Sequence, residues 1–208
     1  MNISIVTGIL LLISSLLCLG TGTYAFCRYS LTQSERLFVI GLAMCITAVG
    51  LACGAVDDLH VFPSFYLNWA WYVGTSLGLL CLFLSSVAKS SGQFRLLKRW
   101  GMIIVAVLIM VIVLTPVFPA EPSGHVAVVL DCLRTSVCLL GFLRYITLYT
   151  SRGTRFSLLM CLAFLFIAIG YVAIIPQLLD PTWNQLTAVG AFIRIIGAGV
   201  LFTSFVLG

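Results

Sequence analysis

The stretch RLLKRWGMIIVAVLIMVIVL, at positions 95–114, decides the fold of this chain. No side chain is polar between Met102 and Leu114, and this run directly follows the basic residues Arg95, Lys98 and Arg99. An apolar run with cations at one end is typical of a helix that crosses a bilayer with its basic end in the cytoplasm. We therefore expect the segment to span a membrane and to face lipid or an apolar partner.

Segments of this kind fill most of the chain. The sequence has 208 residues, of which 62% are hydrophobic and 8% charged, whereas a soluble domain carries about a quarter charged residues. Since a spanning helix needs about 20 apolar residues, we predict an all-α integral membrane bundle of seven transmembrane helices, in a single domain covering residues 1–208. The predicted spans are Ile3–Phe26, Leu37–Val56, Phe65–Ala88, Met102–Phe118, Val126–Tyr149, Phe156–Leu178 and Leu186–Leu207. The first span lacks a basic n-region and is predicted to be a retained helix rather than a signal peptide.

The basic residues predict the orientation, because cytoplasmic connections collect Lys and Arg. Alternate connections hold only acidic charges, Asp57, Asp58, Glu121 and Asp180. This pattern predicts a multi-pass protein of the plasma (cytoplasmic) membrane, with its N-terminus outside and its C-terminus in the cytoplasm. The net charge of +5 reflects this bias and requires no nucleic acid partner. The basic residues of the other connections are Arg28, Arg36, Lys89, Arg95, Lys98, Arg99, Arg144, Arg152 and Arg155.

A weak internal repeat favours a 3+1+3 arrangement of the helices. Ala48-Val49-Gly50 in the second predicted span matches Ala168-Ile169-Gly170 in the sixth, and both spans are followed by an acidic residue. The third and seventh spans both open near tryptophans, Trp69 and Trp183. Two parallel triplets joined by the fourth helix would give this pattern, as in some transporters. The alternative is that membrane helices resemble one another in general and that outer interfaces attract Trp.

Charges at membrane depth mark candidate functional sites, because they are costly to bury in lipid. Asp131 and Arg134 lie three residues apart, on one face of the fifth predicted helix. With a rise of 1.5 Å per residue, they lie roughly 10 and 15 Å from its outer end, and Arg194 lies roughly 16 Å into the seventh helix. Two guanidinium groups and one carboxylate have a net charge of one positive unit. This net charge suits an anionic ligand such as a carboxylate, a phosphate or a lipid head.

The predicted ligand site combines these charges with nearby aromatic residues. Tyr171 reaches a similar depth on the sixth helix, and Trp69 and Tyr72 belong to an aromatic cluster at the outer start of the third. We expect a polar pocket that opens to the outside. Two simpler interpretations remain open: an Asp131–Arg salt bridge that only fixes helix packing, and an aromatic belt at the membrane interface. The predicted ligand-binding residues are Asp131, Arg134, Tyr171, Arg194, Trp69 and Tyr72.

The sequence has no clear pattern for enzyme, metal or cofactor chemistry. A metal site across two outer loops is an alternative, with ligands from Asp57, Asp58, His60, Glu121 and His125, but solvated acidic loops are far commoner. The eight cysteines form no CxxC pair, and we expect them to be buried as small apolar side chains. The seventh helix has no Lys for a retinal Schiff base. We therefore expect a non-enzymatic protein with no metal and no cofactor.

Three functions fit these observations. The overall pattern, including Arg194–Gly197, resembles the seven-helix membrane input regions that precede bacterial signalling domains. This resemblance implies a receptor-like sensory or ligand-binding module, which would act through a separate signalling effector. The alternatives are a membrane subunit or scaffold of a larger complex and a small transporter. Membrane lipids, and other membrane proteins, are the expected partners.

Overall fold

The computed structural model describes residues 3–61, 66–115, 117, 124–179 and 184–207. These residues form helices and short turns, and none of them lies in a strand. Seven of the segments are long and apolar enough to cross a membrane, which confirms the predicted helical membrane bundle. The helices are α1 (Ile3–Thr32), α2 (Glu35–Asp58), α3 (Asn68–Val87), α4 (Ser91–Leu114), α5 (Gly124–Arg152), α6 (Arg155–Val172), the short α7 (Ile175–Leu179) and α8 (Asn184–Leu207).

The start of α4 shows how local capping moves a helix boundary away from the apolar run. The helix begins at Ser91 instead of Met102, because Ser90 and Gln93 form a capping box. The Gln93 N–H donates to the Ser90 hydroxyl oxygen over 3.3 Å, and the Ser90 N–H donates to the Gln93 side-chain oxygen over 3.1 Å. This arrangement satisfies donors that the first turn would otherwise leave unpaired. The basic cluster at 95–99 therefore belongs to the helix and not to a loop.

Pro176 explains why the sixth span is broken. A proline ring inside a helix clashes with the carbonyl group four residues earlier, and α6 ends at that residue, Val172. A turn at 173–174 leads into α7, which contains Pro176. The predicted span Phe156–Leu178 is thus divided into two helices, α6 and α7, by the turn at 173–174.

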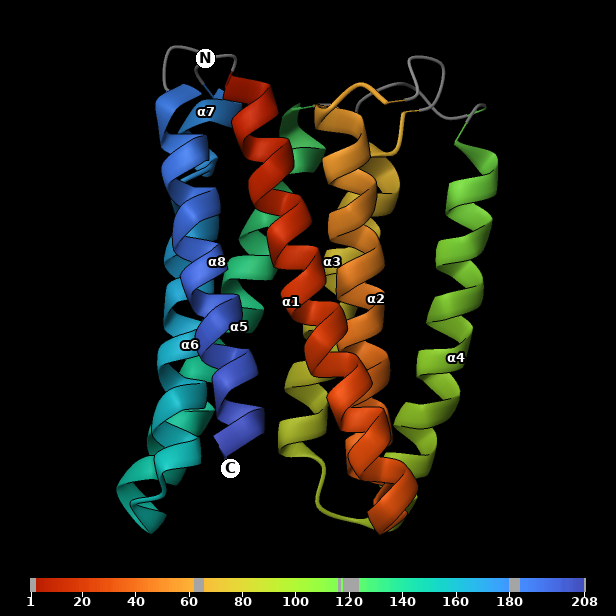
Figure 1. Cartoon of the computed structure of the whole chain (residues 1–208), viewed down its shortest axis with the longest axis vertical. Coiled ribbons are helices and arrows are strands. Elements are labelled where there is room, and N and C mark those ends of the chain that lie inside the picture. The colour runs from red at the N-terminus through yellow and green to blue at the C-terminus, as the bar shows by residue number, and fades with distance from the viewer. Residues whose placement is uncertain (1–2, 62–65, 116, 118–123, 180–183, 208) are drawn as a thin grey trace.

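Six of the long helices form a closed ring. Each packs against the next in the order α1, α2, α3, α5, α6 and α8, and α8 packs against α1. Helix α4 packs on the outside, against α2 and α3 (Figure 1). Gly101 and Leu108 are its buried residues, whereas Ile109, Met110 and Val113 are more than half exposed.

The two ends of the bundle differ in what they carry. The N-terminus and C-terminus lie at opposite ends (Figure 1). The α1–α2, α3–α4 and α5–α6 connections lie at the end with the C-terminus, and the nine basic residues outside the ring interior belong to these connections and the helix ends beside them. We refer below to the N-terminal end and the C-terminal end of the bundle.

Glycine pairs bring neighbouring helices into backbone contact. A Cβ atom on Gly50 of α2 would lie 2.8 Å from the Thr75 nitrogen and 3.2 Å from the Gly74 Cα of α3. A Cβ atom on Gly170 of α6 would lie 2.7 Å from the Gly190 carbonyl oxygen of α8. Small residues allow this close approach, which is a main source of packing energy between membrane helices.

Two of the turns match residue for residue. Helix α1 ends at Thr32 and α2 begins at Glu35, while α5 ends at Arg152 and α6 begins at Arg155. The middle residues, Gln33 and Gly153, have φ angles of 54° and 62°. In each turn the N–H of that residue donates over 2.7 Å to the carbonyl of the tyrosine four residues earlier. Gln33 therefore adopts the left-handed conformation that Gly153 adopts without steric cost.

Candidate functional site

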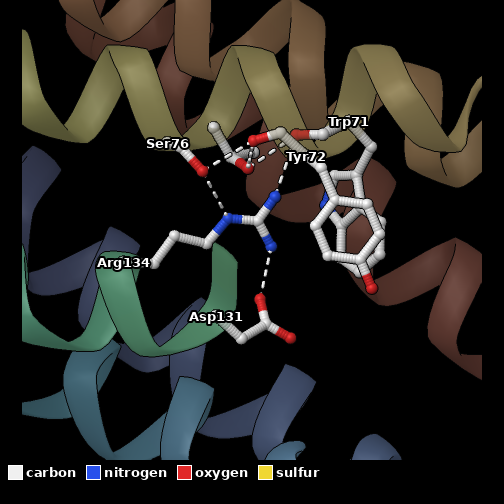
Figure 2. Close-up of polar contacts among 6 residues, drawn as sticks. Trp71, Tyr72, Ser76, Asp131 and Arg134 are labelled. Carbon is white, nitrogen blue, oxygen red and sulfur yellow. Dashed lines mark hydrogen bonds and ion pairs between the residues drawn. The ribbon is translucent and has the colours of Figure 1, made fainter. Parts of the chain in front are cut away.

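Asp131 and Arg134 of α5 form an ion pair inside the bundle (Figure 2). The Arg134 Nη1 atom lies 2.6 Å from Asp131 Oδ1, and both residues are 0% exposed. Their spacing of three residues places both side chains on one face of the helix. In the described part of the chain this is the sole ion pair.

The remaining donors of Arg134 bind helix α3. Its Nε–H donates to the Ser76 hydroxyl oxygen over 3.1 Å, and its Nη2–H donates to the Trp71 carbonyl oxygen over 3.2 Å (Figure 2). Its guanidinium carbon lies 5.0, 4.6 and 5.4 Å from the ring centres of Trp71, Tyr72 and Tyr171. A cation over aromatic faces is stabilised by the ring quadrupole. Arg134 is thus held by a carboxylate, two oxygens of α3 and three rings, and it joins α3 to α5.

Arg194 of α8 is buried as well, but its guanidinium group is bonded differently. The residue is 7% exposed, and among the residues that the structure describes its Nη1 atom has no hydrogen-bond partner and no carboxylate forms an ion pair with it within 4.0 Å. Its guanidinium carbon lies 4.9 Å from the centre of the Tyr171 ring. The two arginines therefore share one aromatic ring, and only Arg134 has its charge neutralised by contact.

Two carboxylates lie within electrostatic reach of Arg194 without contacting it. The charge of Arg194 acts on Asp131 of α5 and on Asp58 at the end of α2. Asp58 is half-buried and also faces the Thr7 hydroxyl. These carboxylates lower the cost of burying Arg194, but neither accepts a hydrogen bond from its Nη1 atom.

A small cavity of about 40 Å³ lies among α1, α2, α3, α6 and α8. Arg194 and Tyr171 belong to its wall, and every other residue of the wall is buried too. Aliphatic side chains such as Leu51, Leu82 and Leu201 make up most of the wall. Small-molecule sites likewise combine apolar walls with a few polar groups, but their volumes are usually about 300–1,000 Å³, so side chains of this wall would have to move aside to admit a ligand.

Several buried polar atoms near Arg134 also have no partner. They are Asp131 Oδ2, Thr135 Oγ1 and the Trp71 indole nitrogen. Buried polar groups in native proteins are nearly always hydrogen-bonded to protein or to ordered water. The region around both arginines therefore offers donors and acceptors beyond those that the protein satisfies itself.

The structure brings five of the six predicted site residues together. Asp131, Arg134 and Tyr72 form one cluster, and Tyr171 connects it to Arg194. The tryptophan whose ring faces Arg134 is Trp71, while the predicted Trp69 is half-buried on the same helix.

Sequence reasoning missed Ser76, the Trp71 contact and the leucine wall. A spacing signal existed for the first two, because Trp71 and Tyr72 are followed one turn later by Thr75 and Ser76 on the same faces of α3. The wall of the cavity is mostly apolar, whereas the sequence indicated a polar pocket; the opening of that pocket to the outside stays a prediction.

The proposed alternative of a metal site gains no support from the described residues. Among them, no group of three or more His, Cys, Asp or Glu side chains could hold a metal ion. Glu121, one of the residues considered for that site, lies outside the described residues.

Comparison of the chain with protein-family models, with curated proteins and with solved structures found no match.

Proposed function

We propose that the protein is a non-enzymatic sensory or ligand-binding membrane module whose cavity takes an anionic, lipid-like ligand. The observation that carries this proposal is Arg194, a buried guanidinium with an unpartnered Nη1 atom in the wall of a mostly apolar cavity. An ionisable residue inside a membrane is a functional-site candidate by default. An apolar wall with one cation fits a molecule that has an apolar body and an anionic head.

The chemistry of arginine supports an anionic head. A guanidinium group presents its donors in a planar fork that matches a carboxylate or a phosphate, and such charge-assisted hydrogen bonds are stronger than neutral ones. Leaving a buried donor unsatisfied costs about 1–3 kcal/mol, and more for charged groups. A ligand that accepts from Arg194 Nη1 would remove that cost.

Arg134 has a different part in the proposal. Its donors already bind Asp131, Ser76 and the Trp71 carbonyl, which favours the interpretation of the Asp131–Arg134 pair as a packing element. We propose that this pair fixes the wall of the site and that Arg194 binds the ligand.

We also propose the orientation and the 3+1+3 arrangement that the sequence suggests. The orientation, with the N-terminus outside, is supported by the basic residues at the C-terminal end of the bundle. The arrangement is supported by the matched turns at Gln33 and Gly153 and by the order of helix contacts, α1–α2–α3 and α5–α6–α8. Ser85 and Ser204 add a further match, because each donates over 2.6 Å to a leucine carbonyl three residues earlier.

A transporter is a second candidate that this arrangement favours, because both triplets contribute to the cavity wall and parallel repeats are found in transporters. Cys18 is a buried thiol in that wall. A transporter would expose this thiol to a membrane-impermeant reagent from each side in turn, whereas a receptor would not expose it to the cytoplasmic side.

The exposed apolar surface of α4 favours a third candidate, a subunit of a larger membrane complex. Purification at native expression levels distinguishes it, since a subunit would be isolated with stoichiometric partner proteins. A receptor would be isolated alone or with a separate signalling effector.

Binding to protein in lipid nanodiscs tests the main proposal. Dodecanoate, dodecyl phosphate and dodecanol share one chain and differ in their head groups. We expect Arg194→Gln to weaken binding of the two anions by about tenfold or more, in line with the loss of charge-assisted hydrogen bonds, and to leave dodecanol unaffected. Arg152→Gln, a change at an exposed arginine of α5, is the matched control. Equal losses in both variants would refute the role of Arg194.

A further inference from the structure

We infer that the ligand is a single-chain amphiphile whose anionic head lies at Arg194 and whose chain points toward the C-terminal end of the bundle. This inference rests on the proposed function and adds the class of ligand and its direction. It follows from the distribution of polar groups along the cavity, the state of the two hydroxyl groups near its middle, and its size.

The polarity of the cavity wall changes along the bundle axis. Arg194 and Tyr171 lie toward the N-terminal end, whereas Leu201 lies seven residues further along α8. A helical rise of 1.5 Å per residue separates Arg194 from Leu201 by roughly 10 Å. Met44 of α2 and Leu82 of α3 also belong to the wall, and both lie toward the same end of the bundle as Leu201. The part of the wall toward the C-terminal end is therefore aliphatic, whereas the part toward the N-terminal end carries the cation together with Leu11 and Leu51.

The hydroxyl groups of the wall do not interrupt its apolar part. Ser14 donates to the Leu10 carbonyl oxygen over 3.0 Å, and Thr47 donates to the Ala43 carbonyl oxygen over 2.9 Å. Both donors are therefore satisfied within their own helices. A bound chain that passes these residues meets methyl and methylene groups without leaving a donor unpaired.

The small size of the cavity excludes a lipid with two long chains. Its volume of about 40 Å³ is below the 300–1,000 Å³ that is usual for small-molecule sites, so even one chain would enter only as aliphatic side chains of the wall move aside. The surrounding helices cannot separate freely, because α2 and α3 are in backbone contact at Gly50 and Gly74 and α6 and α8 at Gly170 and Gly190.

The polar end of the cavity has one donor atom that an anionic group could use. Arg194 has two carboxylates within electrostatic reach and forms an ion pair with neither. A carboxylate or a phosphate in the cavity would accept a hydrogen bond from its Nη1 atom, which is buried without a partner. Carboxylate and phosphate share this chemistry, and the affinities of dodecanoate and dodecyl phosphate distinguish them.

Photolabelling tests the direction of the chain. The probe is dodecanoate with a photoreactive diazirine on its terminal carbon, added to the full chain in nanodiscs of phosphatidylcholine. We expect labelling around Met44, Leu82 and Leu201 that an excess of dodecanoate removes and an excess of dodecanol does not. Labelling concentrated around Tyr171 and Arg194 would overturn the inferred direction while the proposed function stands. The absence of any competed labelling in the cavity would overturn both.

A chain-length series provides a second test that does not depend on labelling chemistry. Leu82→Trp fills the aliphatic part of the cavity, so dodecanoate should bind about tenfold or more weakly while hexanoate is little affected, because the loss of one methylene contact in an apolar pocket already changes affinity by about tenfold or more. Leu140→Trp, at a half-exposed leucine of α5, should change neither affinity. Equal losses for both chain lengths in the folded Leu82→Trp protein would contradict the inference.

Discussion

Two arginines at similar depth have opposite relations to their surroundings. Arg134 is 0% exposed and is bonded to a carboxylate and to two oxygens of α3, whereas Arg194 is 7% exposed and has a buried nitrogen without a partner. Removing one member of a satisfied buried pair leaves the other charge uncompensated, while removing an unpaired charge takes away a cost. Substitutions of the two arginines should therefore change the free energy of unfolding in different ways.

Arg134→Gln is expected to destabilise the protein by about 3–5 kcal/mol, the usual cost of breaking a buried ion pair. Asp131 would lose its partner, and α3 would lose two hydrogen bonds from α5. Chemical unfolding in detergent micelles measures this loss, and Ser76→Ala should show a smaller loss of about 1 kcal/mol. If Arg134→Gln is no less stable than Arg152→Gln, the Asp131–Arg134 pair does not hold α3 and α5 together.

Arg194→Met should leave the unfolding free energy unchanged or higher, even though it abolishes binding of an anionic ligand. Methionine keeps the length of the side chain and its contacts with the apolar wall, while the desolvated charge is removed. Natural binding sites commonly gain stability in this way when a functional residue is replaced. The measurement is the same unfolding experiment in the absence of ligand, and a loss as large as that of Arg134→Gln would show that Arg194 has a mainly structural function.

The sequence could place both arginines in the membrane but could not tell them apart. Hydropathy and the helical rise gave their depth, and the spacing of Asp131 and Arg134 predicted that these two share a helix face. The choice of partners depends on the rotation of α3 and α8 about their axes, which a single sequence does not specify when the helices are apolar on all sides. For this reason Trp69 was favoured over Trp71, and Ser76 was missed.

At the scale of helices, glycines differ according to what lies beside them. Gly197 and Gly199 lie two residues apart in α8, and the sequence alone does not distinguish them. A Cβ atom on Gly197 would lie 2.7 Å from Ile167 and 3.0 Å from the Ala163 carbonyl oxygen of α6, whereas a Cβ atom on Gly199 would meet nothing within 4 Å. Only the structure separates a glycine at a helix contact from one at the surface.

Gly170→Ala should destabilise the contact between α6 and α8. The new methyl group would collide with the Gly190 backbone and with the side-chain stem of Arg194. Overpacking of this kind costs about 1–3 kcal/mol, and displacement of Arg194 should also weaken anion binding. Gly199→Ala, in the same helix pair, is the control and should alter neither property in unfolding and binding measurements. Similar behaviour of the two variants would show that α6 and α8 can separate at no cost.

The sequence predicted the presence of each helix better than the residues at which the helix begins and ends. The apolar runs identified every span, but α4 begins well before its apolar run because of the Ser90–Gln93 capping box. In the same way, α1 continues to Thr32 and α5 to Arg152, beyond the ends of their predicted spans. Hydropathy measures the part of a helix that lies in lipid, whereas capping and turn residues decide where the helix itself stops.

At the scale of the whole molecule, composition and the apolar runs predicted the class of fold. The closed ring and the outer position of α4 were not predicted, although the featureless sequence of α4 indicated a lipid-facing helix. An apolar helix that buries Gly101 and Leu108 has few contacts to fix it, so lipid or a partner protein must cover most of its surface. The cavity depends on the ring, because residues far apart in the sequence, such as Leu11 and Leu201, share its wall only when α1 and α8 are neighbours.

The membrane orientation is the final prediction and applies to the whole chain. Nine basic residues lie in or beside the connections at the C-terminal end, and basic connections remain in the cytoplasm. A protease-accessible tag at the N-terminus should therefore be cleaved from outside intact cells, and the same tag at the C-terminus should be cleaved only after the cells are opened. Replacing Lys89, Arg95, Lys98 and Arg99 with Gln should weaken this preference, while the same number of Gln replacements at apolar positions of α4 should not. Cleavage of both tags from one side would mean that an even number of segments crosses the bilayer, so that one of the seven helices lies in the membrane surface instead of spanning it.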